Sequence, residues 1–517
     1  MKKPHVQQRT ERRISAALRL VMVAVLLVAQ IALVFLLSDV LKQRMALAYS
    51  ALELLAAVVA VTIWSRPGAT SYKIGWVMLV LFVPVVGVIL YLLWNGARQS
   101  KRLDLKKLPR PEEPLAQQEQ AKSELERLRQ AMPCWYPAAA GLYRKGFLVY
   151  RNTAVKYLPT GEAYLNTMLD DLEHAERFIF LEYFIVAEGE IWDQLSDILC
   201  RKSGQGVEVK LIFDDFGSML RMPNEKVEAL TRAGVEVKIF NPVHHYVNRL
   251  YFNYRDHRKI TCIDGDTAYT GGANIADEYA NIVERFGYWK DCGVRLEGEG
   301  AWGLTREFIH MWERMDGEMH SEHDYYRPVH HAAAQGFCQT LVDGPDDNPN
   351  APAEDLFLQF ITRARQSVYV TTPYLAIDEP MMKALCLAGD SGVDVRLMMP
   401  GVPDHKFAYL VAESYFEELM EHHVKIYTFT PGLIHGKTAM ADREVAFVGS
   451  VNMDYRSFQL HFECGEVLYG VPAIESLLED MDRIVDSSEL MTPQRMAERP
   501  MWRRLLGTVL RLFAMWM

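Results

Sequence analysis

The pattern His-x-Lys-x-x-x-x-Asp occurs twice in this chain, at residues 257–264 and again at residues 435–442. An Asn follows each His at the same offset, as Asn274 in the first copy and Asn452 in the second. A register that does not slip between the two copies indicates an internal duplication rather than a coincidence. The chain is therefore expected to contain two related units whose motifs form one site.

Length and composition fit a duplicated unit with an additional segment. A chain of 517 residues is longer than one ordinary domain. The net charge of −10 argues against general binding of nucleic acid, which normally requires a basic surface. The seven Cys are scattered and form no C-x-x-C pair, so they predict neither a disulfide framework nor a zinc site and favour a reducing compartment.

Three apolar segments occupy the first hundred residues, at 20–37, 45–64 and 74–94. Crossing the hydrocarbon core of a membrane takes roughly 20 apolar residues, and the last two segments end in Trp, which suits the membrane interface. Two further apolar segments follow the first without an obvious small-residue cleavage site, which argues against a signal peptide. Residues 1–97 are therefore expected to form a membrane anchor with two or three transmembrane helices.

The charges around these segments leave the topology open. Six Lys and Arg residues precede the first segment and six follow the third, within residues 98–110. The positive-inside rule places both clusters in the cytoplasm, whereas three crossings place them on opposite sides. Glu53 makes the second segment the weakest candidate to span, because an ionisable group at mid-membrane is costly. A re-entrant turn at Pro84 and Gly87 is less favoured, because membrane helices tolerate both residues.

Beyond a polar, helix-prone linker at 98–135, short apolar runs alternate with amphipathic stretches. This alternation predicts α/β sheets with crossover connections, and it recurs in both halves. We expect two duplicated α/β domains packed as a pseudo-dimer, at 136–343 and 344–490, with the boundary in a run of turn-forming residues. The runs expected to form strands are 178–181, 207–213 and 235–240 in the first half, and 367–371, 393–398 and 424–427 in the second.

The last segment, 491–517, is short, basic and amphipathic. Such a segment is expected to lie in a membrane interface rather than to span the membrane. A helix that docks on the protein's own core is the alternative.

The duplicated residues are of the types that phosphodiester chemistry requires. Negative phosphoryl oxygens must be neutralised, while a nucleophile and a proton donor are supplied. Two Lys and two Asn can surround the phosphoryl group, and two His can divide nucleophilic and acid–base roles, so neither a metal nor a cofactor is needed. The candidate catalytic residues are His257, Lys259, Asp264, His435, Lys437 and Asp442, with Asn274 and Asn452 as phosphate-binding residues.

Each His also needs an acceptor for its remaining ring nitrogen. Asp291 and Glu463 stand in matching acid-Cys-Gly contexts, and we assign them this orienting role, with Asp291 beside His257. Asp264 and Asp442 are expected to brace the strand-to-loop geometry instead. The alternative for Asp291 and Glu463 is an ordinary capping or solvent-facing carboxylate. A cluster of His residues at 320–331 has no helical metal-ligand spacing and is not interpreted as a metal site.

The paired motifs, each with Gly-Gly or Gly-Ser before x-Asn, resemble those of the phospholipase D superfamily. From about residue 60 to the end, the layout is similar to that of bacterial cardiolipin synthases. The resemblance implies a multi-pass protein of the bacterial cell membrane that joins two phosphatidylglycerols through a phosphohistidine and releases glycerol. The sequence departs from the family in having His461 where an Asn is common, Cys292-Gly293 in place of Thr-His, and an extra apolar segment at 20–37.

We therefore expect a membrane-anchored phosphatidyltransferase that acts on phosphatidylglycerol, contacts anionic membrane lipids and does not bind nucleic acid. His257 is the expected nucleophile and His435 the general acid and base, while the near-symmetry of the motifs leaves the mirror-image assignment open. Alternatives are a phospholipase D that transfers the group to water, transfer to another alcohol, and a non-catalytic membrane scaffold.

Overall fold

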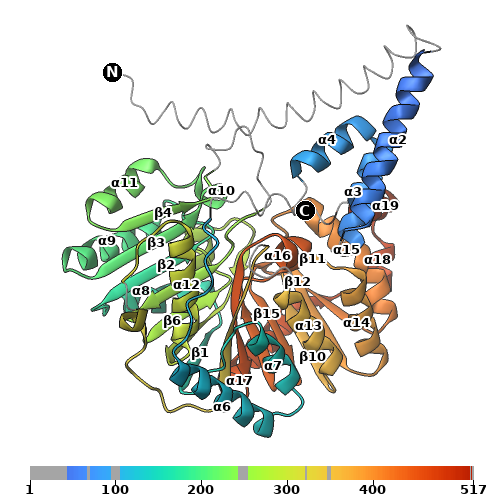
Figure 1. Ribbon diagram of the computed structural model, residues 1–517. Coiled ribbons are helices and arrows are strands. Elements are labelled where there is room, and N and C mark those ends of the chain that lie inside the picture. The colour runs from blue at the N-terminus through green and yellow to red at the C-terminus, as the bar shows by residue number, and fades with distance from the viewer. Residues whose placement is uncertain are drawn as a thin grey trace. The chain divides into compact units, whose positions relative to one another are not determined.

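The computed structural model describes residues 44–66, 70–94, 105–242, 254–320, 323–345, 351–512 and 514 (Figure 1). The chain divides into two compact units, one comprising Met1–Leu103 with Pro242–Phe252 and the other Asp104–Asn241 with Asn253–Met517. The first apolar segment, 20–37, lies outside the described residues.

The described residues of the smaller unit form helices α2 (Arg44–Trp64), α3 (Thr70–Phe82) and α4 (Pro84–Trp94). The third apolar segment is therefore not the single helix that its composition suggested. Pro84 interrupts it, because proline lacks the backbone N–H and clashes with the preceding turn. The α4 helix folds back on α3: the ring of Tyr91 packs edge-on against Trp76 at 5.4 Å between centroids. A Cβ on Gly87 would lie only 2.4 Å from the carbonyl oxygen of Leu79.

A turn at Pro84 and Gly87, which the sequence disfavoured, is thus present in the structure. Across the described residues, no helix combines the length and the apolar character that crossing a membrane demands.

The larger unit begins with the linker, which packs on the first repeat. The linker contains helix α6 (Leu115–Ala131), and helix α7 (Tyr136–Arg144) follows it. Ahead of α6, Glu113 accepts a hydrogen bond of 2.8 Å from the indole N–H of Trp302, and Arg110 donates to Glu307 at 3.1 Å. Both partners lie on helix α12 (Ala301–Arg314), so the polar linker is docked along this helix.

The first repeat is built on a seven-stranded sheet in the order β1-β8-β6-β5-β2-β3-β4. Its parallel part, β2-β3-β4, contains the three strands expected from the alternating pattern, and the crossovers carry helices α9 (Glu190–Gly204) and α11 (Asn224–Arg232). Helix α8 (Gly161–Leu172) precedes β2. The strands are β1 (Thr153–Leu158), β2 (Phe178–Tyr183), β3 (Glu208–Asp214), β4 (Glu236–Phe240), β5 (Lys259–Ile263), β6 (Thr267–Gly271) and β8 (Gly293–Gly298).

The second repeat forms an eight-stranded sheet in the order β19-β13-β12-β10-β15-β16-β18-β9. Its parallel core, β10-β12-β13, again coincides with the expected strands. Helices α13 (Pro352–Arg363), α14 (Glu379–Asp390), α15 (Lys406–Glu421) and α17 (Ala473–Asp486) belong to this repeat. The strands are β9 (Phe337–Asp343), β10 (Ser367–Thr371), β12 (Asp394–Pro400), β13 (Lys425–Phe429), β15 (Lys437–Ala441), β16 (Val445–Gly449), β18 (Glu463–Tyr469) and β19 (Ser488–Leu490).

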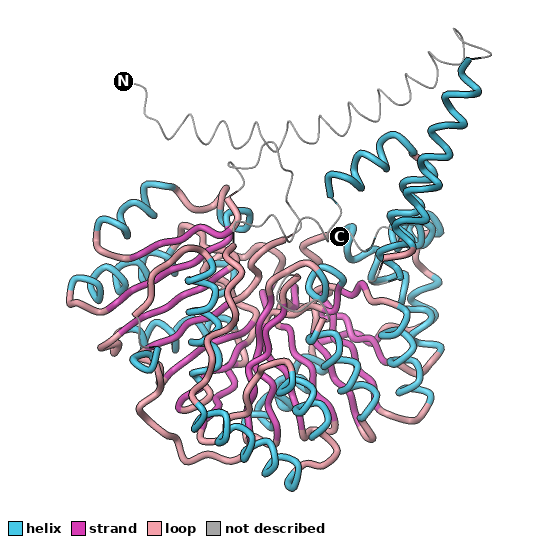
Figure 2. Tube along the Cα trace, viewed as in Figure 1, coloured by secondary structure: helices cyan, strands magenta, loops and turns pink. Residues whose placement is uncertain are grey.

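The two repeats lie side by side, as Figure 2 shows by the two groups of magenta strands with cyan helices around them. Backbone pairing joins them: β14 (Gly432–Ile434) of the second repeat pairs in parallel with β7 (Tyr288–Lys290) of the first. A matching bridge links Asp256 to Phe462. The duplicated α/β domains thus pack as the expected pseudo-dimer.

The C-terminal segment contains α18 (Pro493–Ala497) and α19 (Met501–Arg511), and α19 docks on α15 through its basic side. Arg503 donates two hydrogen bonds to Glu413, at 2.9 and 2.8 Å, and Arg504 donates one to Glu417 at 2.6 Å. The arginines that suggested contact with lipid therefore pair with the protein's own glutamates, as the docking alternative predicted. The opposite side of this helical segment exposes Met501, Trp502, Leu505, Val509 and Leu512.

Candidate active site

Each motif histidine lies just before a buried strand, His257 before β5 and His435 before β15. His257 Nδ1 lies 3.0 Å from Glu463 Oε2, and His435 Nδ1 lies 2.7 Å from Asp291 Oδ2. Each hydrogen bond joins the histidine of one repeat to the acid of the other. The sequence-based pairing of Asp291 with His257 is therefore wrong, and neither repeat completes a His–acid pair by itself.

Backbone pairing between the repeats fixes these crossed contacts. The backbone N–H of His257 donates to the carbonyl of Phe462 at 2.8 Å, and that of His435 donates to the carbonyl of Lys290 at 2.8 Å. In both cases the acid is the residue that follows the accepting carbonyl. The same two-residue arrangement therefore places Glu463 beside His257 and Asp291 beside His435.

Both histidines are buried, and burial favours the neutral form of each imidazole. Burial, followed by the nearby Lys259, holds the pKa of His257 well below its usual value. The pKa of His435 is also lowered by burial and Lys437, although Asp291 opposes the shift. A neutral imidazole that donates its Nδ1–H to a carboxylate carries a lone pair on Nε2. Each histidine can then attack a phosphorus atom or accept a proton.

The motif lysines are also buried, and both fold back on their own histidine. Lys259 Nζ donates to the backbone carbonyl of His257; Lys437 Nζ donates to that of His435 and lies 2.9 Å from His435 Nδ1. Burial lowers the pKa of Lys259 to about 7 and that of Lys437 to about 8. Burying an ammonium group is costly unless an anion accompanies it, so the pair of lysines favours binding of an anion such as a phosphodiester.

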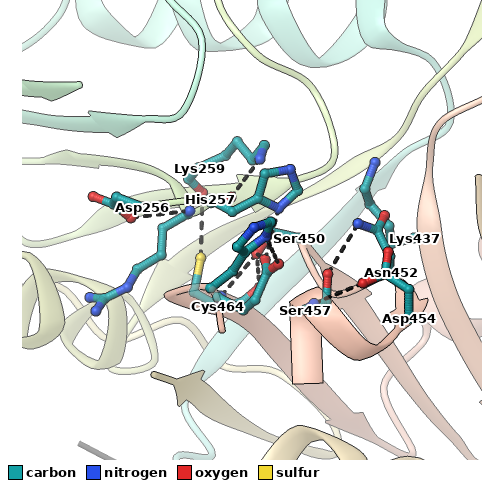
Figure 3. Close-up of polar contacts among 12 residues, drawn as sticks. Asp256, His257, Lys259, Lys437, Ser450, Asn452, Asp454, Ser457 and Cys464 are labelled. Atoms are coloured by element: carbon teal, nitrogen blue, oxygen red, sulfur yellow. Dashed lines mark hydrogen bonds and ion pairs between the residues drawn. The ribbon is translucent and has the colours of Figure 1, made fainter. Parts of the chain in front are cut away.

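The acids of the crossed pairs differ in their surroundings. Burial alone would raise the pKa of Asp291, but His435 and Lys437 hold it below its ordinary value. Glu463 accepts a second hydrogen bond from the hydroxyl of Ser450. Ser450 and His257 are labelled near each other in Figure 3. In the first repeat the residue at the position of Ser450 is Gly272, where an added Cβ would lie 2.2 Å from Asp291 Oδ1. The first repeat therefore has no space for a hydroxyl at this point.

The two motif asparagines brace loops beside the site. Asn274 Oδ1 accepts from the backbone N–H of Ile185 at 3.0 Å, and its Nδ2 donates to the hydroxyl of Tyr279 at 2.7 Å. Asn452 Nδ2 donates to Ser457 Oγ at 3.1 Å (Figure 3). Each Nδ2 carries two N–H groups, so a bracing bond occupies one of them. The expected contact with phosphoryl oxygens stays a prediction for the other.

The motif aspartates lie at the far ends of their strands, about 20 Å from the histidines along the chain. Asp264 accepts from the backbone N–H groups of residues 176–178, and Asp442 accepts from those of residues 365–367. Their backbone φ angles, 54° and 53°, match as well. This position fits the bracing role expected from the sequence and removes both aspartates from the set of residues that can touch a substrate.

Among the rings that pack on the two histidines, Trp289 and His461 occupy equivalent positions in the two repeats, and sequence reasoning gave neither of them a role in the site. The Trp289 ring lies 5.3 Å from that of His435, and the His461 ring lies 5.5 Å from that of His257. Both residues stand two positions before an orienting acid. The sequence signal that could have identified them is their position two residues before each orienting acid, which is the same in both repeats.

The histidines at 320–331 do not gather into one cluster. His323 Nε2 lies 2.9 Å from Glu313 Oε1, His331 Nδ1 lies 3.1 Å from Glu299 Oε1, and His320 stacks on Tyr325. Each of these three rings has a separate partner, and the contacts indicate no chemical role for the region.

Crossed His–acid pairs with buried lysines, on a duplicated α/β scaffold, define a site of the phospholipase D type. The family described as "Cardiolipin synthase, PLD-like domain" matches residues 168–285 and 357–485, one stretch in each repeat. The family described as "Phospholipase_D-nuclease N-terminal" matches residues 54–95.

Relatives of known name agree with these matches. The chain is 35% identical to a cardiolipin synthase of Geobacillus kaustophilus over 453 residues, covering 86% of this chain and 88% of that one. It is 33% identical to cardiolipin synthase 2 of Bacillus anthracis over 446 residues, 86% of each. The fold is shared with a phosphatidylserine synthase of Haemophilus influenzae, with a TM-score of 0.56 at 13% identity, over 72% of this chain and 97% of that one.

The chain belongs to the cardiolipin synthase family of the phospholipase D superfamily. It is accordingly an enzyme of the phosphatidyltransferase class.

The depressed pKa of Lys437 predicts an alkaline limit to activity. Lys259 has a depressed pKa as well, so we expect kcat/KM to fall as the pH rises through about 7 to 8, because the free enzyme loses the ammonium charge of Lys259 and then that of Lys437. The limit on kcat should lie at higher pH, because a bound phosphodiester anion favours the charged lysine. Initial rates measured from about pH 6 to 10 test this. A kcat/KM that stays constant to the top of that range would contradict a requirement for the charged lysine.

The bracing role of Asp442 predicts a loss of stability rather than of chemistry. Asp442→Ala leaves three backbone N–H groups without their acceptor and should lower the free energy of unfolding by about 3 kcal/mol. Asp482→Ala, which removes an exposed carboxylate, is the matched control, with an expected change below about 0.5 kcal/mol. Thermal unfolding and residual activity are measured for both. An Asp442→Ala protein with unchanged melting and no activity would contradict this role.

Proposed function

We propose that the protein is a membrane-associated cardiolipin synthase that transfers the phosphatidyl group of one phosphatidylglycerol to a second one and releases glycerol. The observation that carries the proposal is the crossed pairing of His257 with Glu463 and of His435 with Asp291. It supplies one imidazole with a free Nε2 lone pair and a second that a carboxylate can hold as an imidazolium, around one buried site with two lysines, within a family whose named members include cardiolipin synthases.

In the first step, His257 Nε2 attacks the phosphorus of phosphatidylglycerol, and the bond from phosphorus to the glycerol oxygen breaks. His435 takes part in this step as an imidazolium, the form that Asp291 stabilises, and it gives its Nε2 proton to that oxygen, so that glycerol leaves and a phosphatidyl-histidine remains. Two contrasts support this order of roles. The pKa of His257 is the more strongly depressed, which suits an unprotonated nucleophile, and His435 has the closer carboxylate, which stabilises an imidazolium.

In the second step, a hydroxyl of another phosphatidylglycerol gives its proton to His435 and attacks the same phosphorus. The bond from phosphorus to His257 breaks, cardiolipin forms, and both imidazoles return to their starting state. Lys259 and Lys437 neutralise the phosphoryl oxygens throughout, where negative charge increases in each transition state. No metal or cofactor takes part in either step.

Association with the bacterial cell membrane is the second part of the proposal. Three apolar segments near the N-terminus and the basic residues at 98–110 support a multi-pass anchor beside anionic lipid headgroups. Helix α19 supports a further contact, because its basic side is paired with α15 while its apolar side is exposed. An exposed apolar stripe that includes Trp502 suits a lipid interface.

Lipid mass spectrometry tests the reaction. Purified protein mixed with phosphatidylglycerol vesicles should produce cardiolipin and glycerol, while His257→Ala and His435→Ala should each lower the rate by at least about a thousandfold. Phosphatidic acid without cardiolipin would instead identify a phospholipase D, and a mixed ester formed only with an added alcohol would identify a different acceptor.

Trapping of the intermediate tests the order of roles within the same reaction. A phosphatidyl-enzyme should accumulate in His435→Ala protein and be absent from His257→Ala protein. The opposite result would exchange the two roles.

Vesicle binding tests the apolar side of α19. The double change Trp502→Glu and Leu505→Glu, made in protein that lacks residues 1–97 so that the N-terminal segments do not hold it on the vesicle, should weaken binding to phosphatidylglycerol vesicles by at least about tenfold, because two apolar side chains no longer enter the lipid. Gln494→Glu adds the same kind of charge outside the stripe and serves as the control. Unchanged binding by the double variant in flotation assays would show that this stripe does not contact lipid.

A further inference from the structure

His461 is a buried histidine beside the proposed nucleophile, and its ring makes no hydrogen bond within the described residues. Its side chain is 11% exposed. Its Nδ1 lies 3.6 Å from Glu463 Oε1, which also lacks a hydrogen-bond partner among the described residues. Buried polar atoms in folded proteins are nearly always paired. Two such atoms that face each other, His461 Nδ1 and Glu463 Oε1, therefore indicate a place for a bound group.

The atoms around this point form a set of metal ligands. His257, His461 and Glu463 each offer one ligand atom, and these three atoms all lie within 4.8 Å of one another. In a tetrahedral zinc site, bonds of about 2.0–2.2 Å keep ligand atoms about 3.3 Å apart. The two oxygens of Glu463 each face one imidazole at close to that spacing: Oε1 lies 3.6 Å from His461 Nδ1, and Oε2 lies 3.0 Å from His257 Nδ1.

We propose that His257, His461 and Glu463 form a binding site for a divalent transition-metal ion, for which zinc is the best match, and that metal bound there inhibits the enzyme. Two imidazole nitrogens and one carboxylate suit Zn²⁺ better than Mg²⁺ or Ca²⁺, which prefer ligand sets made of oxygen atoms. The hydroxyl of Ser450 donates a hydrogen bond to Oε2 of Glu463, as outer partners of metal ligands do. The negative charges of Glu463 and Asp291 offset those of the two motif lysines.

Inhibition follows from the single proton that a neutral imidazole carries. In the metal-free arrangement this proton is on His257 Nδ1, where it bonds to Glu463, and Nε2 is free. A metal on Nδ1 displaces the proton, which must then reside on Nε2. The nitrogen that would attack phosphorus no longer has a free lone pair. This effect depends on the proposed role of His257, whereas binding of the metal does not.

The other half of the site provides an internal comparison. At the position equivalent to His461 the first repeat has Trp289, whose indole N–H is a donor and cannot ligate a metal. The ammonium group of Lys437 also lies 2.9 Å from His435 Nδ1. The proposal therefore specifies one zinc ion per chain, on the His257 side.

The experiment measures binding of Zn²⁺ to the full-length protein in detergent, without substrate, by isothermal titration calorimetry. Wild-type protein should bind one ion, and His461→Asn should bind it at least about tenfold more weakly, because an amide is a poor zinc ligand. His405→Asn removes a histidine that is 71% exposed on its side chain and is the matched control, with unchanged binding expected. Melting temperatures of all three proteins verify that they are folded.

Activity assays with added Zn²⁺ complete the test. Inhibition of the wild type should be reversed by a chelator, and the inhibitory concentration should rise at least about tenfold in His461→Asn. Equal binding by wild type and His461→Asn, or no binding by wild type, would overturn the site. Binding that is lost in His461→Asn without any inhibition of the wild type would preserve the metal site and overturn the role of His257, which separates the two failures.

Discussion

The site depends on backbone hydrogen bonds exchanged between the two repeats. The N–H groups of His257 and His435 each donate to a carbonyl of the opposite repeat, and the residue after that carbonyl is the acid that receives the imidazole. The same backbone hydrogen bond occurs once on each side, and it both joins the repeats and positions a His–acid pair. A small shift of one repeat would disturb both pairs at once, because the same strands carry the pairing and the chemistry.

The charges in this site nearly balance without a ligand. Lys259 and Lys437 oppose Glu463 and Asp291, and all four side chains are buried. Removing such groups from water is costly, and this cost lowers the pKa values of both lysines. A phosphodiester shifts the balance, because its negative charge gives both ammonium groups a close partner. Binding of substrate and charging of the lysines are thus coupled, which gives a site of this kind its preference for an anion.

Much of this arrangement could be predicted from the sequence because the duplication repeats it. The parallel strands of both sheets, the histidines, the lysines and the two orienting acids all follow from patterns that occur twice. The crossed pairing could not be predicted, because sequence spacing relates Asp291 to His257 within one repeat, whereas the contact is formed between β14 and β7 of different repeats. The fold-back at Pro84 could not be predicted for another reason. Membrane helices tolerate Pro and Gly, and the composition of the segment does not reveal the close approach to α3 that Gly87 permits.

The differences between the repeats make the surroundings of the two histidines unequal in a nearly symmetric site. Two equal His–acid pairs would leave either imidazole free to act as nucleophile, and the proposed reaction would have no preferred order. The second repeat supplies His257 with a carboxylate held by Ser450 and with the polar ring of His461, whereas the first supplies His435 with Asp291 at closer range and the apolar face of Trp289. A tighter carboxylate favours the imidazole that carries the proton, and the other imidazole is left with a free lone pair. In the proposed reaction, differences at positions that contact the histidines, rather than at the histidines themselves, would thus separate the roles of two residues that occupy equivalent positions in the repeats.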